Sequence, residues 1–283
     1  MRKLELAEIQ QIELEIFDAF VRLCKQHGLS YQLAYGSLLG AVRHQGFIPW
    51  DDDIDLLMPR EHYRKLVAIV NGMNADGIVD GRYRFADPGV KSSLPYHQTF
   101  MKIYDMRTCA SETSLRRSLG FQEGVFIDVF SLEGMPDDAR EEEERFDRLD
   151  HLNDMVYYST RQPCLDDLNP VHPRAFLQNA KGYLQASRKP YRAWIGEYYS
   201  ELDNYGNAMG AARTCCMRVR NMDGVAAPKN NPYFPTIEAP FEGRSISIPK
   251  NYDQILRDSY GEYLQLPPKG SRKPSHDQDF FLK

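Results

Sequence analysis

The sequence predicts a mixed α/β protein, and three features of the chain lead to this prediction. The first half alternates helix-like and strand-like apolar spacing, with short polar breaks between the segments. The second half reads mainly as charged amphipathic helices. Of 283 residues, 42% are hydrophobic and 27% are charged, which allows a sizeable core beneath a charged surface. We therefore expect an α/β fold of the α+β type, with a mixed sheet core, surrounding helices and a helical C-terminal half.

The N-terminal stretch alternates between predicted helix and strand. Apolar side chains recur mostly three and four positions apart up to His27-Gly28, where a glycine can end a helix. Gly46 and Pro49 interrupt any regular spacing and indicate a loop. The predicted elements are, in order, a helix (4–27), a short strand (31–35), a short helix (37–43) and a loop (45–50).

Further strands and one helix are expected up to residue 136. Acidic and apolar residues alternate over 53–58, as in a half-buried strand, and Pro59 marks its end. Apolar and aromatic residues dominate three later segments that we predict to be strands. The expected elements are a strand (53–58), a helix (61–70) and three strands (82–86, 98–105 and 124–132).

The pattern becomes helical and charged near residue 136, where we place the boundary between two regions. We predict an α/β core over 1–136 and a helical region over 137–283 that packs on it. Within the second region the expected elements are helices (137–199), a loop (228–235), a hairpin (236–248) and a last helix (252–260).

Composition excludes several classes of protein. A net charge of -5 provides no basic surface for nucleic acid. The 5 cysteines are scattered, without the spacing of a zinc site, and are expected to be reduced thiols. No apolar stretch approaches the roughly 20 residues that a membrane-spanning helix needs. We expect a cytoplasmic protein, with peripheral contact at the inner face of the membrane left open.

The densest chemistry lies in the acidic run from Asp51 to Asp55. Carboxylates this close together repel one another unless they are solvated, protonated or bound to cations. Ile54 and Leu56 have the pattern of buried neighbours, so a freely solvated loop is disfavoured. On one strand, Asp53 and Asp55 would point to the same face and could bracket Mg²⁺ or Mn²⁺. A calcium loop of the EF-hand type is excluded, because its glycine and glutamate positions hold Leu56 and His62.

Two other segments complete a candidate site. Gly36-Ser37 lies between a predicted strand and helix, where backbone N–H groups and a hydroxyl can bind an anion. Strand, Gly-Ser, short helix and an Asp-x-Asp strand resemble the core of nucleotidyltransferase-fold enzymes. Asp128 stands alone in an apolar strand, where a carboxylate needs a cation or a partner. We therefore predict Asp53, Asp55 and Asp128 as catalytic and metal-binding residues.

A longer resemblance emerges from the same residues. The run from Tyr35 to His44, the run from Gly46 to Leu56 and the strand around Asp128 closely resemble the LicD phosphotransferases. This family includes bacterial phosphocholine transferases and is related to the fukutin-type ribitol-phosphate transferases. The similarity is dense over 31–60 and 120–132, extends to a closing motif over 249–268, and gives no information on 137–235.

The resemblance implies a reaction and its partners. A phospho-alcohol, most often phosphocholine, would pass from a CDP-linked donor such as CDP-choline to a sugar hydroxyl of a glycan or glycolipid, and CMP would leave. The metal would neutralise the diphosphate, and Asp128 could also accept the hydroxyl proton. Gly36 and Ser37 would bind the donor phosphate.

For the remaining candidates the residue types allow more than one role. Arg43 and Lys102 are proposed to bind phosphate, with a surface ion pair and a solvated lysine as the alternatives. His44 could position the acceptor or serve the loop. Asp51 and Asp52 could orient water, accept a proton or cap the loop. The residues Arg272, Lys273 and His276 could meet donor or acceptor.

Two competing functions use the same parts. A nucleotidyltransferase that adds a nucleotide to a small molecule would need the same Gly-Ser and Asp-x-Asp elements. The loop from Arg43 to Trp50 favours the phosphotransferases. A non-catalytic nucleotide- or glycan-binding protein would be expected to lack one of the three aspartates, and all three are present.

Overall fold

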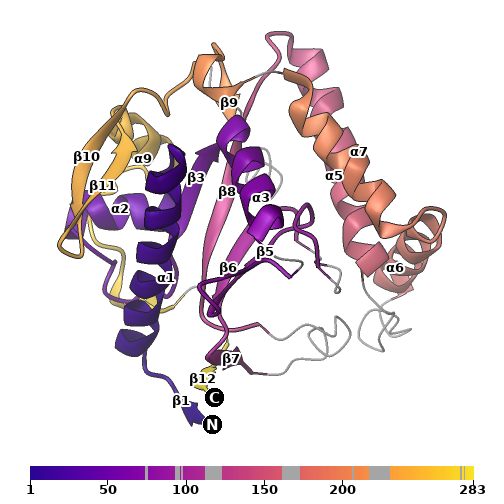
Figure 1. Ribbon diagram of the computed structural model, residues 1–283. Helices are drawn as coiled ribbons and strands as arrows, with labels where there is room; N and C mark the ends of the chain where they lie inside the picture. The colour runs from indigo at the N-terminus through magenta and orange to yellow at the C-terminus, as the bar shows by residue number, and fades with distance from the viewer. Residues whose placement is uncertain are drawn as a thin grey trace.

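A mixed sheet forms the centre of the protein, with helices on both sides (Figure 1). The computed structural model describes residues 1–73, 76–92, 96, 98–111, 123–160, 173–205, 207–216, 230–274, 276 and 278–283. The central sheet has the order β2-β3-β8-β6-β5-β4, and β9 pairs with β8. Its strands are β2 (Gln32–Leu33), β3 (Asp55–Pro59), β4 (Ile78–Val79), β5 (Tyr83–Ala86), β6 (Met101–Asp105), β8 (Phe126–Gly134) and β9 (Thr214–Cys215).

Helices α1 (Leu6–His27) and α3 (Arg60–Met73) pack on one face of this sheet (Figure 1). The apolar stripe of α1 accounts for its position, because Ile16, Phe17 and Phe20 are completely buried there. Helix α1 ends at Gly28, whose left-handed φ of 62° suits a residue without a side chain. The predicted helix over 4–27 and its glycine stop are thus confirmed.

Strand pairing decides which side chains share the opposite face. Strands β3 and β8 are parallel, whereas β8 and β6 are antiparallel. Leu56 packs in the main core with α1, so its neighbours Asp55 and Leu57 point to the other face. That second face has a smaller cluster of its own, which includes Leu57 and Phe130.

The second half of the chain adds helices and returns to the core. Helices α5 (Ala139–Thr160), α6 (Pro173–Ala186) and α7 (Tyr191–Leu202) form a separate apolar cluster beside the sheet (Figure 1). The hairpin β10 (Thr236–Phe241) and β11 (Arg244–Pro249) and helix α9 (Tyr252–Tyr260) then pack on the main core. The short 3-10 helices are η1 (Asp203–Tyr205), η2 (Ala208–Gly210) and η3 (Lys269–Ser271).

The two ends of the chain meet in a small sheet that the sequence did not predict. Strand β12 (Phe280–Leu282) pairs with both β1 (Arg2–Lys3) and β7 (Thr108–Ala110), as Figure 1 shows at the bottom of the molecule. These strands are too short for a recognisable apolar pattern. Phe280 is buried in the main core, so the end of the chain is part of the packing around the central sheet.

The predicted α/β class is confirmed, and so are the main strands, the late hairpin and the last helix. Two local expectations differ from the structure. Strand β3 begins at Asp55, so Asp53 lies in the preceding loop and not on the strand. Helix α2 (Tyr35–His44) begins earlier than predicted, which places Gly36 and Ser37 in its first turn. The boundary near residue 136 stays a prediction, and residues 161–172 of the predicted helical stretch 137–199 lie outside the described residues.

Candidate active site

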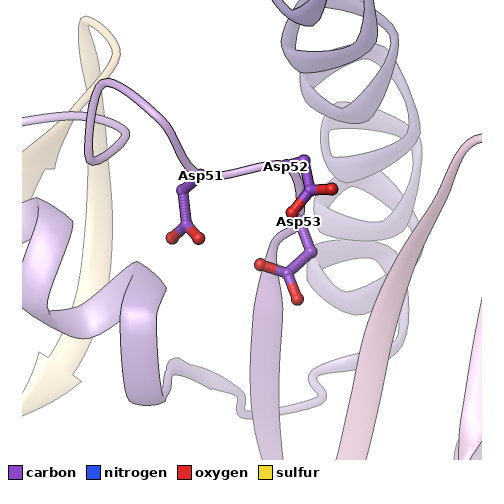
Figure 2. A group of neighbouring side chains, drawn as sticks. All are labelled: Asp51, Asp52 and Asp53. Carbon is purple, nitrogen blue, oxygen red and sulfur yellow. The ribbon is translucent and has the colours of Figure 1, made fainter. Parts of the chain in front are cut away.

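Three carboxylates cluster on the loop that leads into β3. Asp51 and Asp52 are buried and Asp53 is partly buried, and each offers an oxygen atom within 4.8 Å of the others. Figure 2 shows the Asp51 and Asp53 side chains on the same side of the loop, with a helix to the right, beside Asp52. The sequence drew attention to Asp53, and the structure brings Asp51 and Asp52 into the same cluster.

Asp55 and Asp128 lie directly opposite each other on neighbouring strands. They are paired in the register of β3 and β8, so their side chains emerge on the same face of the sheet. Lys102 of β6 is paired with Asp128 from the other side. Strand pairing alone therefore brings together two aspartates that lie 73 positions apart in the sequence.

Burial and mutual repulsion raise the pKa values of these carboxyl groups. Loss of solvent, followed by the charges of Asp53 and Asp52, raises the pKa of Asp51 from 3.8 to about 7. Burial likewise raises the pKa of Asp53 to about 6, and His276 partly opposes this. The pKa of Asp55 lies well above its ordinary value because of burial and the nearby charges of Asp53 and Asp128.

The Gly36-Ser37 turn is in direct contact with the acidic run. A Cβ atom at Gly36 would lie 2.8 Å from Oδ2 of Asp51, so the carboxylate occupies the space that any side chain would need. The Asp55 N–H group donates a hydrogen bond to Oγ of Ser37 at 2.9 Å. Tyr35, just before the turn, has a φ of 43°, an uncommon value for a residue other than glycine. The two motifs that the sequence singled out thus form one unit.

Lys102 is paired with a carboxylate and is not a solvated lysine. Its Nζ donates to both carboxylate oxygens of Asp128, at 2.7 and 2.8 Å, and both residues are buried. The amine also lies 3.4 Å from the centre of the Phe126 ring. Burial raises the pKa of Asp128, and the Lys102 charge counteracts part of that rise. The phosphate-binding role of Lys102 stays a prediction. In this structure its amine is paired with Asp128 and would have to contact a phosphate from that position.

Arg43 contacts the C-terminal segment, by which we mean residues 261–283. Its Nη1 donates to the Tyr263 carbonyl at 2.7 Å, and its Nε donates to Nε2 of His44 at 3.0 Å. A guanidinium has five N–H donors, so further donors remain for an anion. Burial and the adjacent Arg43 charge lower the pKa of His44. Both roles considered for His44, positioning the acceptor and serving the loop, stay predictions.

The structure places two further residues at this site: His276, for which the sequence suggested contact with donor or acceptor, and Glu13, which sequence reasoning did not assign to it. The His276 N–H group donates to the Asp52 carboxylate oxygens at 3.4 and 3.2 Å, and Nδ1 lies 3.9 Å from Oδ2 of Asp53. Burial lowers the pKa of His276, but Asp52 and Asp53 outweigh this and raise it overall. Because 224 positions separate His276 from Asp52, no local pattern predicts their contact.

The second residue is Glu13, in helix α1. Its side chain is 1% exposed, and its Oε2 atom has no hydrogen-bond partner in the described part of the chain. Burial, and then the charges of Asp53 and Asp52, raise the pKa of Glu13 well above its ordinary value. A signal existed here, because Glu13 interrupts an apolar stripe that includes Ile12, Ile16 and Phe17.

The donor set fits a divalent cation bound through oxygen. Lys102 contacts Asp128, and His276 contacts Asp52 and Asp53, so the aspartates at this position outnumber these two basic side chains. Oε2 of Glu13 is buried without a hydrogen-bond partner among the described residues, and burial followed by neighbouring carboxylates raises the pKa values of Asp51 and Asp55, so a cation here would favour their ionised forms. Carboxylate oxygens are the ligands that Mg²⁺ and Mn²⁺ prefer.

Comparison with known proteins points to one family. Residues 28–110 match the family model described as LicD/FKTN/FKRP, nucleotidyltransferase domain. The chain is 28% identical, over the full length of both proteins, to the lipopolysaccharide cholinephosphotransferase LicD of Haemophilus influenzae. Local matches link it to uncharacterised proteins of Rickettsia typhi (42% identity over 16% of each chain) and Rickettsia prowazekii (53% over 12% of this chain and 13% of the relative).

The two main matches cover complementary parts of the site. The family model includes the Gly36-Ser37 turn, the acidic run and Lys102, and the full-length match extends through Asp128 and His276. The fold expected from the sequence, a mixed sheet with Gly-Ser and Asp-x-Asp elements side by side, is the fold observed. These comparisons show that residues 28–110 are similar to the LicD/FKTN/FKRP nucleotidyltransferase domain and that the whole chain is similar to a LicD protein, which supports a relationship to the LicD family.

Proposed function

We propose that the protein transfers phosphocholine from CDP-choline to a sugar hydroxyl of a cell-surface glycan or its lipid-linked precursor. Full-length similarity to a lipopolysaccharide cholinephosphotransferase supports a transferase of this kind. The observation that carries the proposal is the convergence of Asp53, Asp55 and Asp128 beside the Gly36-Ser37 turn. A diphosphate donor needs such a site, because its negative charge must be neutralised before an oxygen nucleophile can approach.

In the proposed reaction the acceptor hydroxyl oxygen forms a bond to the phosphorus that bears choline. The bond from that phosphorus to the oxygen shared with CMP breaks, and CMP leaves with that oxygen and its electron pair. The hydroxyl proton passes to a carboxylate, for which we propose Asp128 because it faces Asp55 across the strand pair. No change in oxidation state is involved.

Asp53, Asp55 and Asp128 would hold Mg²⁺ or Mn²⁺, which would supply charge neutralisation at the diphosphate and the leaving CMP. The chain's own groups prepare the site. Ser37 accepts the Asp55 N–H and so orients that aspartate. Gly36 leaves room for Asp51. Lys102 holds Asp128 in place and would offer a positive charge to a phosphate oxygen.

The acceptor determines where the reaction would occur. No helix in the described residues combines the length and the apolar character needed to cross a bilayer. We propose that the enzyme works in the cytoplasm and meets a glycolipid acceptor, such as a lipopolysaccharide precursor, at the inner face of the membrane. CDP-linked ribitol, glycerol and ethanolamine are the alternative donors.

A donor screen tests this function directly. Purified protein is incubated with Mg²⁺ and each of CDP-choline, CDP-ribitol, CDP-glycerol and CDP-ethanolamine, and CMP release is followed by chromatography. We expect metal-dependent CMP release from CDP-choline and none after chelation by EDTA. Release from another CDP-alcohol alone would replace choline with that alcohol. Pyrophosphate release from nucleoside triphosphates, without CMP release from any donor, would instead identify a nucleotidyltransferase.

A further inference from the structure

Helix α6 presents leucine and basic side chains together on its outward face. Arg174, Leu177, Lys181 and Leu184 follow one another at spacings of three and four, which places them along one side of the helix. Arg188 comes four positions after Leu184, in the turn that follows the last helical residue, Ala186. All five are exposed, and Leu177 and Leu184 are each 66% exposed. We call these five residues the α6 stripe. Two large apolar side chains exposed to this degree, two helical turns apart on one side of a helix, suggest a surface that binds a partner.

The opposite side of α6 fixes this orientation. Gly182 lies against the Tyr158 ring of α5, which leaves no space for a side chain there. The Tyr158 hydroxyl donates to Oδ1 of Asn179 at 2.8 Å, and Ala186 is buried in the cluster formed by the three helices. Because these contacts lie on the inner side, α6 cannot turn its leucines inward without losing them. The stripe therefore faces away from the protein's own core.

Charge separates this region from the rest of the chain. The protein carries 40 acidic residues and a net charge of -5, yet no acidic residue occurs between Asp167 and Glu197. That interval contains five basic residues, Arg174, Lys181, Arg188, Lys189 and Arg192. Lys189 forms an ion pair with Glu197. In the described part of the chain, the three basic residues of the α6 stripe form no ion pair with a carboxylate. An acidic protein thus presents a local positive surface with leucines in its middle.

We infer that the α6 stripe binds the surface of an anionic phospholipid membrane. The leucines would enter the boundary between headgroups and acyl chains, and the basic side chains would contact lipid phosphates. A second copy of the chain is a poorer partner, because apposed stripes would bring like charges together. The inference does not depend on the proposed chemistry, and if both hold, the stripe would bring the enzyme to its lipid-linked acceptor.

Vesicle sedimentation of the full chain tests the inference. We expect binding to phosphatidylcholine vesicles that contain phosphatidylglycerol, weak binding to phosphatidylcholine alone, and weakening by salt. The variant Arg174→Gln/Lys181→Gln/Arg188→Gln should bind about a hundredfold more weakly, at about fivefold for each charge removed. The variant Leu177→Ser/Leu184→Ser should lose at least about tenfold. All five positions are exposed, so both variants should keep the wild-type circular dichroism and melting temperature.

Matched controls separate the stripe from general charge and from catalysis. Lys25→Gln/Lys65→Gln/Lys250→Gln removes three exposed charges elsewhere and should leave vesicle binding within about twofold, because the lipid field acts only near the surface. Asp55→Asn should bind vesicles like the wild type even if it is inactive. Equal binding of the wild type to both vesicle types, or of the charge variant to anionic vesicles, would overturn the inference. So would a dimer in light scattering that disappears in the leucine variant without any vesicle binding.

Discussion

Lys102 and Asp128 show how the site holds charge at the scale of single residues. Two hydrogen bonds of 2.7 and 2.8 Å join them in a buried position beside the Phe126 ring. A buried ion pair contributes little net stability, but loss of one partner leaves the other charge without compensation. The pair therefore makes the folded state depend on a positive charge at Asp128.

Replacing Lys102 with methionine tests this dependence. In EDTA, Lys102→Met should lower the free energy of unfolding by about 3–5 kcal/mol, because Asp128 would be left buried and unpaired. Added Mg²⁺ should restore part of the loss if it occupies the same carboxylates. Urea unfolding with and without Mg²⁺ measures both effects, and Lys65→Met, at an exposed lysine, is the control. Unchanged stability in EDTA would contradict a structural ion pair.

Gly36 offers a second test at the residue scale. In Gly36→Ala the new methyl group would lie 2.8 Å from Oδ2 of Asp51, so the carboxylate or the turn must move. We expect turnover to fall about a hundredfold, the usual effect of a shift of about 1 Å in a catalytic arrangement. Gly72→Ala, where a Cβ meets nothing within 4 Å, should keep full activity and gain slightly in stability. Equal activity of both variants would show that the Asp51 position is unimportant.

Substitution of the site aspartates should have the largest effect on activity. Asp53→Asn and Asp55→Asn should each reduce CMP release by about 10²–10³, the loss expected when an electrostatic contact to the transition state is removed. Asp147→Asn changes an exposed aspartate on α5 and should be neutral. Circular dichroism checks that the fold survives. Near-normal turnover of either site variant would refute the metal assignment.

At the scale of elements, helix α2 connects the turn to the C-terminal segment. Arg43, at the end of this helix, donates to the Tyr263 carbonyl, and Arg272 of the same segment lies 5.6 Å from the Trp50 ring. His276 then reaches Asp52. The acidic loop is thus held from both sides, by α2 within the core motif and by a segment more than 200 positions away.

Arg43→Gln tests whether this connection is structural, catalytic or both. Loss of a charge-assisted hydrogen bond to Tyr263 should lower the free energy of unfolding by about 1.5–3 kcal/mol. Chemical denaturation measures this, and Arg22→Gln, at an exposed arginine, is the control. A higher KM for the donor in this variant would show that Arg43 also binds a donor phosphate through its remaining N–H groups. An unchanged KM would limit Arg43 to holding the C-terminal segment.

At the scale of the whole molecule, the acidic site should make stability depend on pH and cation together. The folded pKa values of Asp51 (about 7) and Asp53 (about 6) exceed the ordinary 3.8. The folded protein therefore retains protons that the unfolded chain has already released, so its stability falls as pH rises through this range. In EDTA we expect a lower melting temperature at about pH 8 than at about pH 5.

Divalent cation should reverse this trend. Once the carboxylates bind Mg²⁺, their ionised forms are favoured, and the melting temperature at the higher pH should rise with Mg²⁺ concentration. Differential scanning calorimetry over both variables measures this. Identical pH profiles with and without Mg²⁺ would argue against a cation at these aspartates.

Local patterns determined much of this protein from sequence. The spacing of apolar residues in α1 and α5, the alternation in β3 and the glycine at position 28 act within a few positions of the chain. The acidic run was recognisable because clustered carboxylates next to buried residues cost free energy unless a cation or partner compensates them. The Gly36-Ser37 turn was recognisable from its position between a predicted strand and a predicted helix. Asp128 was identified for the same reason, as a carboxylate inside an apolar strand.

Only the tertiary structure decided how these parts meet. Pairing of β3 with β8 brings Asp55 opposite Asp128, and pairing of β6 brings Lys102 to the same carboxylate. The contact of His276 with Asp52 and the pairing of β12 with β1 and β7 join the end of the chain to its beginning. Sequence patterns report preferences over one or two turns or strands, whereas these contacts depend on packing of the whole chain, which no local pattern encodes.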